Sequence, residues 1–117
     1  MRPQRNDNQN HSVLQSLSRR GLFHRVSGGI YGVASYYYSS VCGGTTNAAS
    51  GYGAAVLGGS NNTASYYYST VAGGAYGESS GYYSAISGGY YGDATGTSAT
   101  VGGGDYTVVS TTYGFSY

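Results

Sequence analysis

Lysine and tryptophan are absent from this 117-residue sequence, proline and cysteine occur once each, and only 8% of the residues are charged. Valine, isoleucine and leucine are few, so a conventional globular core would bury too little apolar surface to offset the entropy of ordering the chain. No run approaches the roughly 20 apolar residues of a membrane span. A single cysteine, Cys42, excludes a disulfide within the chain. Composition alone therefore favours disorder or a fibrous or repetitive structure.

The few charges are unevenly placed. Residues 1–25 carry a net charge of +4, because Asp7 is their only acid and they contain every basic residue: Arg2, Arg5, Arg19, Arg20 and Arg25. The remainder has no lysine or arginine, so we expect no nucleic-acid partner, since phosphates require cations. Residues 1–24 are predicted to be a basic tail, disordered or docking. An organelle transit peptide is the alternative, and the apolar stretch of a secretory signal is not seen.

Glycine, with 22 residues, reveals a repeat. Glycine pairs recur every 15 residues without insertion or deletion, and we expect them in turns: Gly28 and Gly29, Gly43 and Gly44, Gly58 and Gly59, Gly73 and Gly74, Gly88 and Gly89, Gly103 and Gly104. A β-branched residue stands two positions before each pair: Val26, Val41, Val56, Val71, Ile86 and Val101. A small residue usually follows six positions after the first glycine, as in Ala34, Ala49, Ala64 and Ala94. These two series are the predicted core.

The fixed period predicts an all-β protein, a parallel β-solenoid of six 15-residue coils over residues 25–114, with 115–117 as a C-terminal end. Glycine at every turn excludes helices. A third recurring position holds Gly32, Asn47, Asn62, Gly77 and Gly92, which we interpret as a left-handed turn residue. One valine and one alanine per coil bury little surface, so we expect chains to associate or tyrosines to add burial.

The segments "NTASYYYSTVAGG" (62–74), "NAASGYGAAVLGG" (47–59) and "GESSGYYSAISGG" (77–89) resemble the head repeats of bacterial trimeric autotransporter adhesins and related phage and surface fibre proteins. The family pattern is close to N-x-A-S-G-x-x-S-x-V-x-G-G, and the resemblance covers about residues 26–114. It implies a left-handed parallel β-roll in which three chains pack side by side. It also implies binding to extracellular matrix, host cells or other copies, without enzymatic activity. The tyrosine content is unusual for that family, and no stalk or membrane anchor is seen.

The 16 tyrosines are the main candidates for function. We expect them to stack across coils in two ladders, forming an interaction surface: Tyr37, Tyr52, Tyr67 and Tyr82 in the first, and Tyr76, Tyr91 and Tyr106 in the second. Neighbouring residues of a strand point to opposite faces, so at least one member of each triplet should face outward. The ladders either stiffen the rod or form an adhesive face for protein or carbohydrate.

Other reactive groups give weaker signals. His11 and His24 lie in the tail, and Cys42 aligns with small or apolar residues, so we interpret it as a packing residue. Glu78 and Asp93 share one repeat position, where they could hold a cation, although two solvated loop acids are the simpler interpretation. We therefore expect no catalytic residues, metal or cofactor.

The resulting hypothesis is a non-enzymatic structural or adhesive module, extracellular or on a cell or virion surface, that forms a homo-oligomer. A trimer is favoured, with a fibre as the other form, and the ligand would be an extracellular protein or carbohydrate. One alternative is an ice-binding solenoid. Another is a self-assembling filament or coat protein, because the exposed ends of a solenoid are edge strands.

Overall fold

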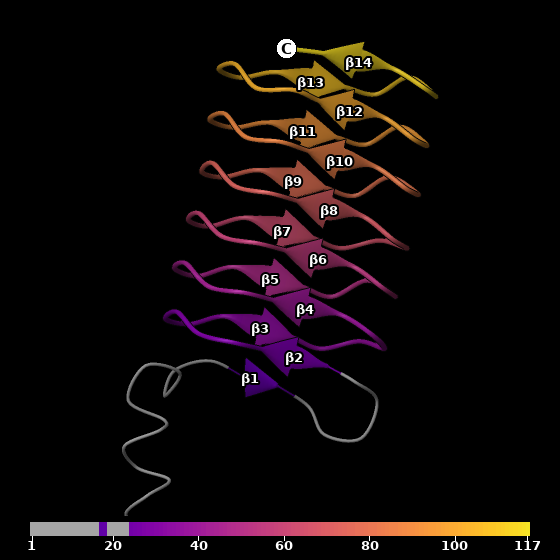
Figure 1. Ribbon diagram of the computed structural model, residues 1–117. Coiled ribbons are helices and arrows are strands. Elements are labelled where there is room, and N and C mark those ends of the chain that lie inside the picture. Colours follow the sequence, from indigo (N-terminus) through magenta and orange to yellow (C-terminus); the bar gives the residue numbers. More distant parts are fainter. Residues whose placement is uncertain (1–16, 19–23) are drawn as a thin grey trace, which may run out of the picture.

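The computed structural model describes residues 17–18 and 24–117, and it shows a parallel β-solenoid of about six turns. The chain winds between two stacked ladders of short strands, which Figure 1 shows rising from β1 and β2 to β13 and β14. The odd sheet contains, in spatial order, β1 (Leu17–Ser18), β3 (Val33–Ala34), β5 (Ala48–Ala49), β7 (Thr63–Ala64), β9 (Glu78–Ser79), β11 (Asp93–Ala94) and β13 (Val108–Val109). The even sheet contains β2 (Arg25–Val26), β4 (Ser40–Val41), β6 (Ala55–Val56), β8 (Thr70–Val71), β10 (Ala85–Ile86), β12 (Thr100–Val101) and β14 (Phe115–Ser116). The predicted all-β solenoid is confirmed.

The pairing register follows the 15-residue period of the sequence. Ala85 pairs with Thr100, for example, and Asp93 with Glu78. The exception is β1, where Leu17 pairs with Val33, an offset of 16 that the glycine spacing does not reveal. Both sheets also extend beyond residues 25–114, by β1 at one end and β14 at the other. In the part of the chain that the structure describes, no helix has the length and hydropathy needed to cross a membrane.

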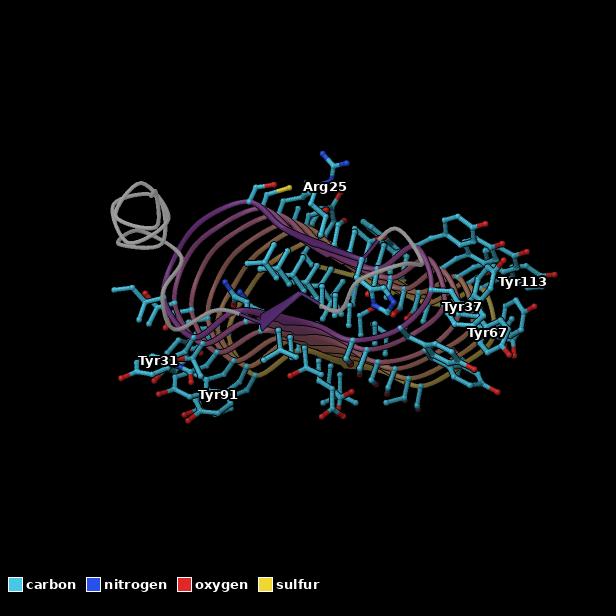
Figure 2. All side chains as sticks on the ribbon, turned by 90° about the horizontal axis from the view of Figure 1, so that it is seen from below. Arg25, Tyr31, Tyr37, Tyr67, Tyr91 and Tyr113 are labelled. Atoms are coloured by element: carbon cyan, nitrogen blue, oxygen red, sulfur yellow. The ribbon has the colours of Figure 1, made fainter. Side chains whose placement is uncertain are left out.

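The core has four inward-facing positions in each coil, where the sequence predicted two. Figure 2, a view along the solenoid axis, shows a flattened ring whose interior is filled by side chains from both sheets. The valine and isoleucine series of the even sheet is buried from Val41 onward, while Val26 is only partly buried. The alanine series of the odd sheet is fully buried. The two added positions hold Ser39, Ala54, Ser69, Ser84 and Ala99 in one series and Asn47 and Asn62 in the other.

Asn47 and Asn62 correct the predicted turn geometry. The expectation of a left-handed backbone at this position is wrong, because the left-handed residue is the preceding one, Thr46 or Asn61, with φ of 55° and 57°. Both asparagine side chains point inward, and their Nδ2 groups donate to two glycine carbonyls each, at 2.8–3.1 Å. Their Oδ1 atoms accept from the backbone N–H one coil further on, Asn62 and Gly77 respectively. The position selects asparagine because a buried amide can satisfy turn backbone groups.

Glycine takes this position in the next two coils, where the neighbouring core residue is larger. A Cβ built on Gly77 would lie 3.5 Å from Cδ1 of Ile86, and one on Gly92 would lie 3.5 Å from its Cγ2. Ile86 is the one isoleucine in a series of valines. Cδ1, the carbon that isoleucine has and valine lacks, therefore occupies part of the space beside Gly77 that an asparagine side chain would fill, which keeps the interior close-packed there.

Candidate functional site: two tyrosine edges

The tyrosines lie at the two narrow edges of the flattened coil, and the broad faces are formed by other residues. Figure 2 shows Tyr31 and Tyr91 at one edge and Tyr37, Tyr67 and Tyr113 at the other, while Arg25 projects from a broad face. The triplet edge consists of the tight turns that begin at residues 36, 51, 66 and 81 and their equivalents above. The glycine edge consists of the turns that contain the glycine pairs.

The tyrosine triplets lie in turns and not in strands, so the premise that their side chains alternate along a strand is wrong. The expectation that at least one member of each triplet faces outward is confirmed. Tyr66, Tyr67 and Tyr68 are all exposed, because the backbone bends through them and the Ser69 N–H donates to the Tyr66 carbonyl at 3.2 Å. Ser69 Oγ also donates to that carbonyl, at 2.8 Å, and accepts from the Tyr66 N–H at 3.1 Å. A buried serine thus fixes the turn while all three rings point away from the core.

Half of the tyrosines have a left-handed backbone, which the sequence analysis missed. Positive φ of 55–59° occurs at eight of them: Tyr31, Tyr38, Tyr68, Tyr76, Tyr83, Tyr91, Tyr106 and Tyr113. This conformation costs about 1–2 kcal/mol for an L-residue. It also turns the N–H toward the preceding coil, so that Tyr68 donates to the Tyr52 carbonyl at 2.7 Å. The sequence does contain a signal for this conformation. Gly53 and Asn61, residue types that tolerate positive φ, occupy the two repeat positions at which these tyrosines stand in other coils.

The predicted ladders exist as ring contacts between coils. On the triplet edge, Tyr52 stacks on Tyr67 and Tyr67 on Tyr82, with ring centroids 5.7 and 5.5 Å apart. Tyr37 contacts Tyr52 at 6.0 Å in a tilted geometry. A further stack, Tyr68 on Tyr83 at 5.3 Å, was not predicted.

The ladder of the glycine edge is the more regular one. Tyr76 stacks on Tyr91 and Tyr91 on Tyr106, with centroids 4.8 and 4.9 Å apart and ring planes within 10° of parallel. Tyr90 contacts all three rings edge-on.

Burial, followed by the charges of neighbouring phenols, raises the pKa of the Tyr52, Tyr82 and Tyr90 hydroxyls above its ordinary value. The phenols at these sites are neutral donors and acceptors at physiological pH.

An open pocket of about 290 Å³ lies beside this second ladder, across the last three coils. It is lined by Tyr76, Tyr91 and Tyr106 together with Glu78, Asp93 and Val108. Glu78 and Asp93 are paired residues of β9 and β11, so their carboxylates are one coil apart, as the sequence predicted. Burial raises the pKa of the Asp93 carboxyl, and its Oδ1 atom is buried without a hydrogen-bond partner among the described residues.

The remaining candidates lie apart from this pocket. Cys42 is exposed on the even-sheet side, where its predicted packing role does not hold within one chain. Asp105 is exposed and pairs with Tyr90 in a ladder of single bridges. His11 lies outside the described residues, and His24 is partly buried, with its ring 6.5 Å from that of Tyr37. Within residues 17–18 and 24–117, no three histidine, cysteine or acidic residues come together as a metal site.

The broad face of the even sheet presents small side chains. Ser40, Ala55, Thr70, Ala85 and Thr100 follow one another up this face, and all are partly buried. The alternation of alanine with hydroxyl residues makes this face flat but chemically mixed.

No protein-family model matches the chain, and a comparison with curated proteins gives no match either.

Proposed function

We propose that this chain is a non-enzymatic structural module that associates with copies of itself and displays its tyrosine edges as adhesive surfaces, on the outside of a cell or particle. The observation that supports this most directly is that both tyrosine ladders are exposed, while the buried core is formed by other residues. An exposed tyrosine ring with its hydroxyl suits contact with proteins and carbohydrates, since it combines apolar area with a hydrogen-bonding group.

The repeat pattern supports a trimer as the assembled form. The motif N-x-A-S-G-x-x-S-x-V-x-G-G resembles the heads of trimeric autotransporter adhesins, in which left-handed rolls pack side by side. The flat even-sheet face is compatible with such packing, because Ala55 and Ala85 would let a second backbone approach closely. In this proposal the broad faces form the chain contacts and the narrow edges remain free for ligands.

Sedimentation of the full chain tests the trimer. The expected mass is three times the 12.0 kDa of one chain. Ala85→Glu, on the broad face, should shift the particle toward monomer, because it would bury an unpaired carboxylate in the contact. Tyr67→Thr is the matched edge control, since Thr97 occupies the equivalent position, and it should leave the mass unchanged while lowering binding to matrix proteins or glycans. A monomeric wild-type chain would refute self-association.

A filament is the second candidate, and the sheet ends favour it. Among the described residues, the terminal strands β13 and β14 each pair with one strand only, as do β1 and β2, so no described strand covers their outer edges. Stacking one copy on another would continue both parallel sheets, because an unpaired edge strand can pair with a strand of another chain. Electron microscopy of concentrated protein should then show rods longer than one chain.

A further inference from the structure

We infer that the glycine-edge ladder is a site of oxidative tyrosine coupling, at which carbon–carbon bonds between phenol rings join one copy of this chain to another. The ladder consists of Tyr76, Tyr91 and Tyr106, with Tyr90 against them edge-on. The site rests on the ladder itself, and only the choice of partner rests on the proposed association of copies. All 16 tyrosines lie in residues 31–117, which the structure describes throughout, so it places every ring that could react.

The stacking geometry directs the reactive edges of these rings outward. A phenoxyl radical couples through the ring carbons ortho to its oxygen, and these carbons lie on the ring edge. Tyr91 has another ring over each face, with centroids 4.8 and 4.9 Å away, so it presents an edge to solvent and is 39% exposed. Figure 2 shows the oxygen tips of the sticks outermost beside Tyr91. A ring of another copy can therefore reach an ortho carbon while the ladder stays stacked.

Carboxylates beside this ladder supply the proton acceptors that phenol oxidation needs. Burial, followed by neighbouring phenols, raises the pKa of the Tyr90 hydroxyl, so this phenol is neutral and must lose a proton when it loses an electron. Glu78 and Asp93 line one pocket with the three stacked rings, and no lysine or arginine occurs in residues 26–117 to neutralise them. The Asp93 Oδ1 atom has no hydrogen-bond donor among the described residues, and burial raises the pKa of this carboxyl, which makes it a better proton acceptor.

The triplet edge lacks this combination of rings and carboxylates. Its turns contain no acidic residue, and the acids of residues 26–117 are Glu78, Asp93 and Asp105. Asp105 pairs with Tyr90 on the glycine edge. We therefore expect oxidation to select the glycine edge, although both edges are rich in exposed tyrosine.

The backbone disfavours bonds along the ladder of a single chain. Stacked rings face each other through their π surfaces, whereas the new bond lies in the plane of both rings and leaves each ring obliquely to its hydroxyl axis. Tyr76 and Tyr91 would have to turn out of their stack and splay apart. Their backbones are held one coil apart, since the Tyr91 N–H donates to the Ala75 carbonyl at 2.9 Å. A ring of another copy has no such restraint, so coupling between copies is favoured.

The reaction balances with hydrogen peroxide as the oxidant, used by a peroxidase. Each of two phenols loses one electron to the peroxidase and its hydroxyl proton to a carboxylate, which passes the proton to solvent. The two radicals form a bond between ortho carbons, and the hydrogen on each of these carbons then moves to the ring oxygen, so that both phenols are restored. One peroxide takes up the two electrons and two protons and becomes two water molecules. Each link therefore removes two hydrogen atoms from the protein.

Treatment of the full chain with a peroxidase and hydrogen peroxide tests the site. We expect covalent oligomers in a denaturing gel, dityrosine fluorescence, and links that mass spectrometry of peptides assigns mainly to the glycine edge. The ladder variant carries Tyr76→Asn, Tyr91→Asn and Tyr106→Asn. Asparagine suits these positions because Asn61 has the same left-handed backbone at the equivalent position. This variant should form severalfold less covalent oligomer than the wild-type chain.

A matched control removes the same number of left-handed tyrosines from the triplet edge. It carries Tyr38→Asn, Tyr68→Asn and Tyr83→Asn, whose φ values of 55–59° equal those of the ladder positions. It should change the yield of covalent oligomer by less than about twofold. Equal losses in the two variants, or links spread evenly over both edges, would overturn the glycine edge as the site.

A third variant, Glu78→Gln with Asp93→Asn, tests the proton acceptors while keeping every ring. The initial rate of coupling at the glycine edge should fall by at least about tenfold. Near-ultraviolet circular dichroism should show unchanged ring stacking, which a purely structural role of the two acids would alter. An unchanged coupling rate would overturn the carboxylates as proton acceptors.

Sedimentation of the unoxidised chain separates this inference from the proposed trimer. A trimer whose glycine edge does not couple would overturn the coupling site and leave the proposed function standing. A monomeric chain that still couples through the glycine edge would refute self-association and leave the site standing. Dityrosine confined to single chains would overturn the link between copies.

Discussion

Replacement of Asn62 by alanine should be among the most damaging single changes to this solenoid. The Asn62 side chain is fully buried and makes three hydrogen bonds, to the Gly58 and Gly74 carbonyls at 3.0 Å each and from the Gly77 N–H at 2.8 Å. The Gly74 carbonyl also accepts from Ser60, at 3.0 Å, and keeps that partner in the variant. The Gly58 carbonyl and the Gly77 N–H lose theirs.

Two unsatisfied backbone groups at about 1–2 kcal/mol each, with a small cavity added, give an expected loss of about 3–4 kcal/mol in the free energy of unfolding. The adjacent Asn61 is the control. It has φ of 57°, and its side chain bonds only to Ser60, so Asn61→Gly should cost less than about 1 kcal/mol. Urea unfolding followed by circular dichroism measures both variants. Equal losses for the two would refute the assignment of Asn62 as an internal clamp between coils.

Three further predictions concern the turns and the pocket. Gly74→Ala should cost about 3 kcal/mol or more in unfolding free energy, because φ is 89° there and a Cβ would collide with the Gly89 carbonyl. Gly73→Ala should be nearly neutral, since nothing lies within 4 Å of its Cβ, and a large loss of stability in that variant would contradict the prediction. Tyr68→Gly should be more stable than Tyr68→Ala by about 1 kcal/mol in thermal unfolding, because only glycine relieves the left-handed strain at φ 55°. If the alanine variant is the more stable of the two, as is usual elsewhere, the backbone at Tyr68 is not strained. Burial raises the pKa of Asp93 in the folded chain, so the folded state holds that proton more tightly, and the free energy of unfolding falls as pH rises from the ordinary aspartate pKa of about 3.9 through the folded value. In dilute samples Asp93→Asn should remove the share of this decrease that comes from Asp93. The same dependence of unfolding free energy on pH in both chains would count against the prediction.

The sequence was sufficient for the architecture because the period is a global constraint. A 15-residue spacing kept by glycine pairs and by the Val26 series admits few structures other than stacked coils, and the structure has both sheets in that register. The ladder Tyr76, Tyr91 and Tyr106 followed from the same spacing, since residues one period apart are neighbours in a parallel solenoid.

Local conformation was less predictable, because one residue type can be selected for different reasons. Asparagine at position 62 suggested tolerance of positive φ, but its amide is used as an internal hydrogen-bonding group, and Asn61 is the residue with the left-handed backbone. The tyrosine triplet suggested a strand, since tyrosine is common in strands. Ser69 decides otherwise, by closing a turn over Tyr66, and a single buried serine is a weak signal in a sequence rich in serine.

The separation of core and edges has a consequence for how such a module could change in size. Each coil contacts only the coils directly below and above it, and the register between most coils is the same. Duplication of 15 residues would therefore lengthen the rod by one step of about 4.8 Å and add one rung to each edge, while every existing contact stays as it is. For a surface that binds through repeated tyrosines, the number of coils sets the valency, so avidity could be adjusted by repeat number without a new binding site.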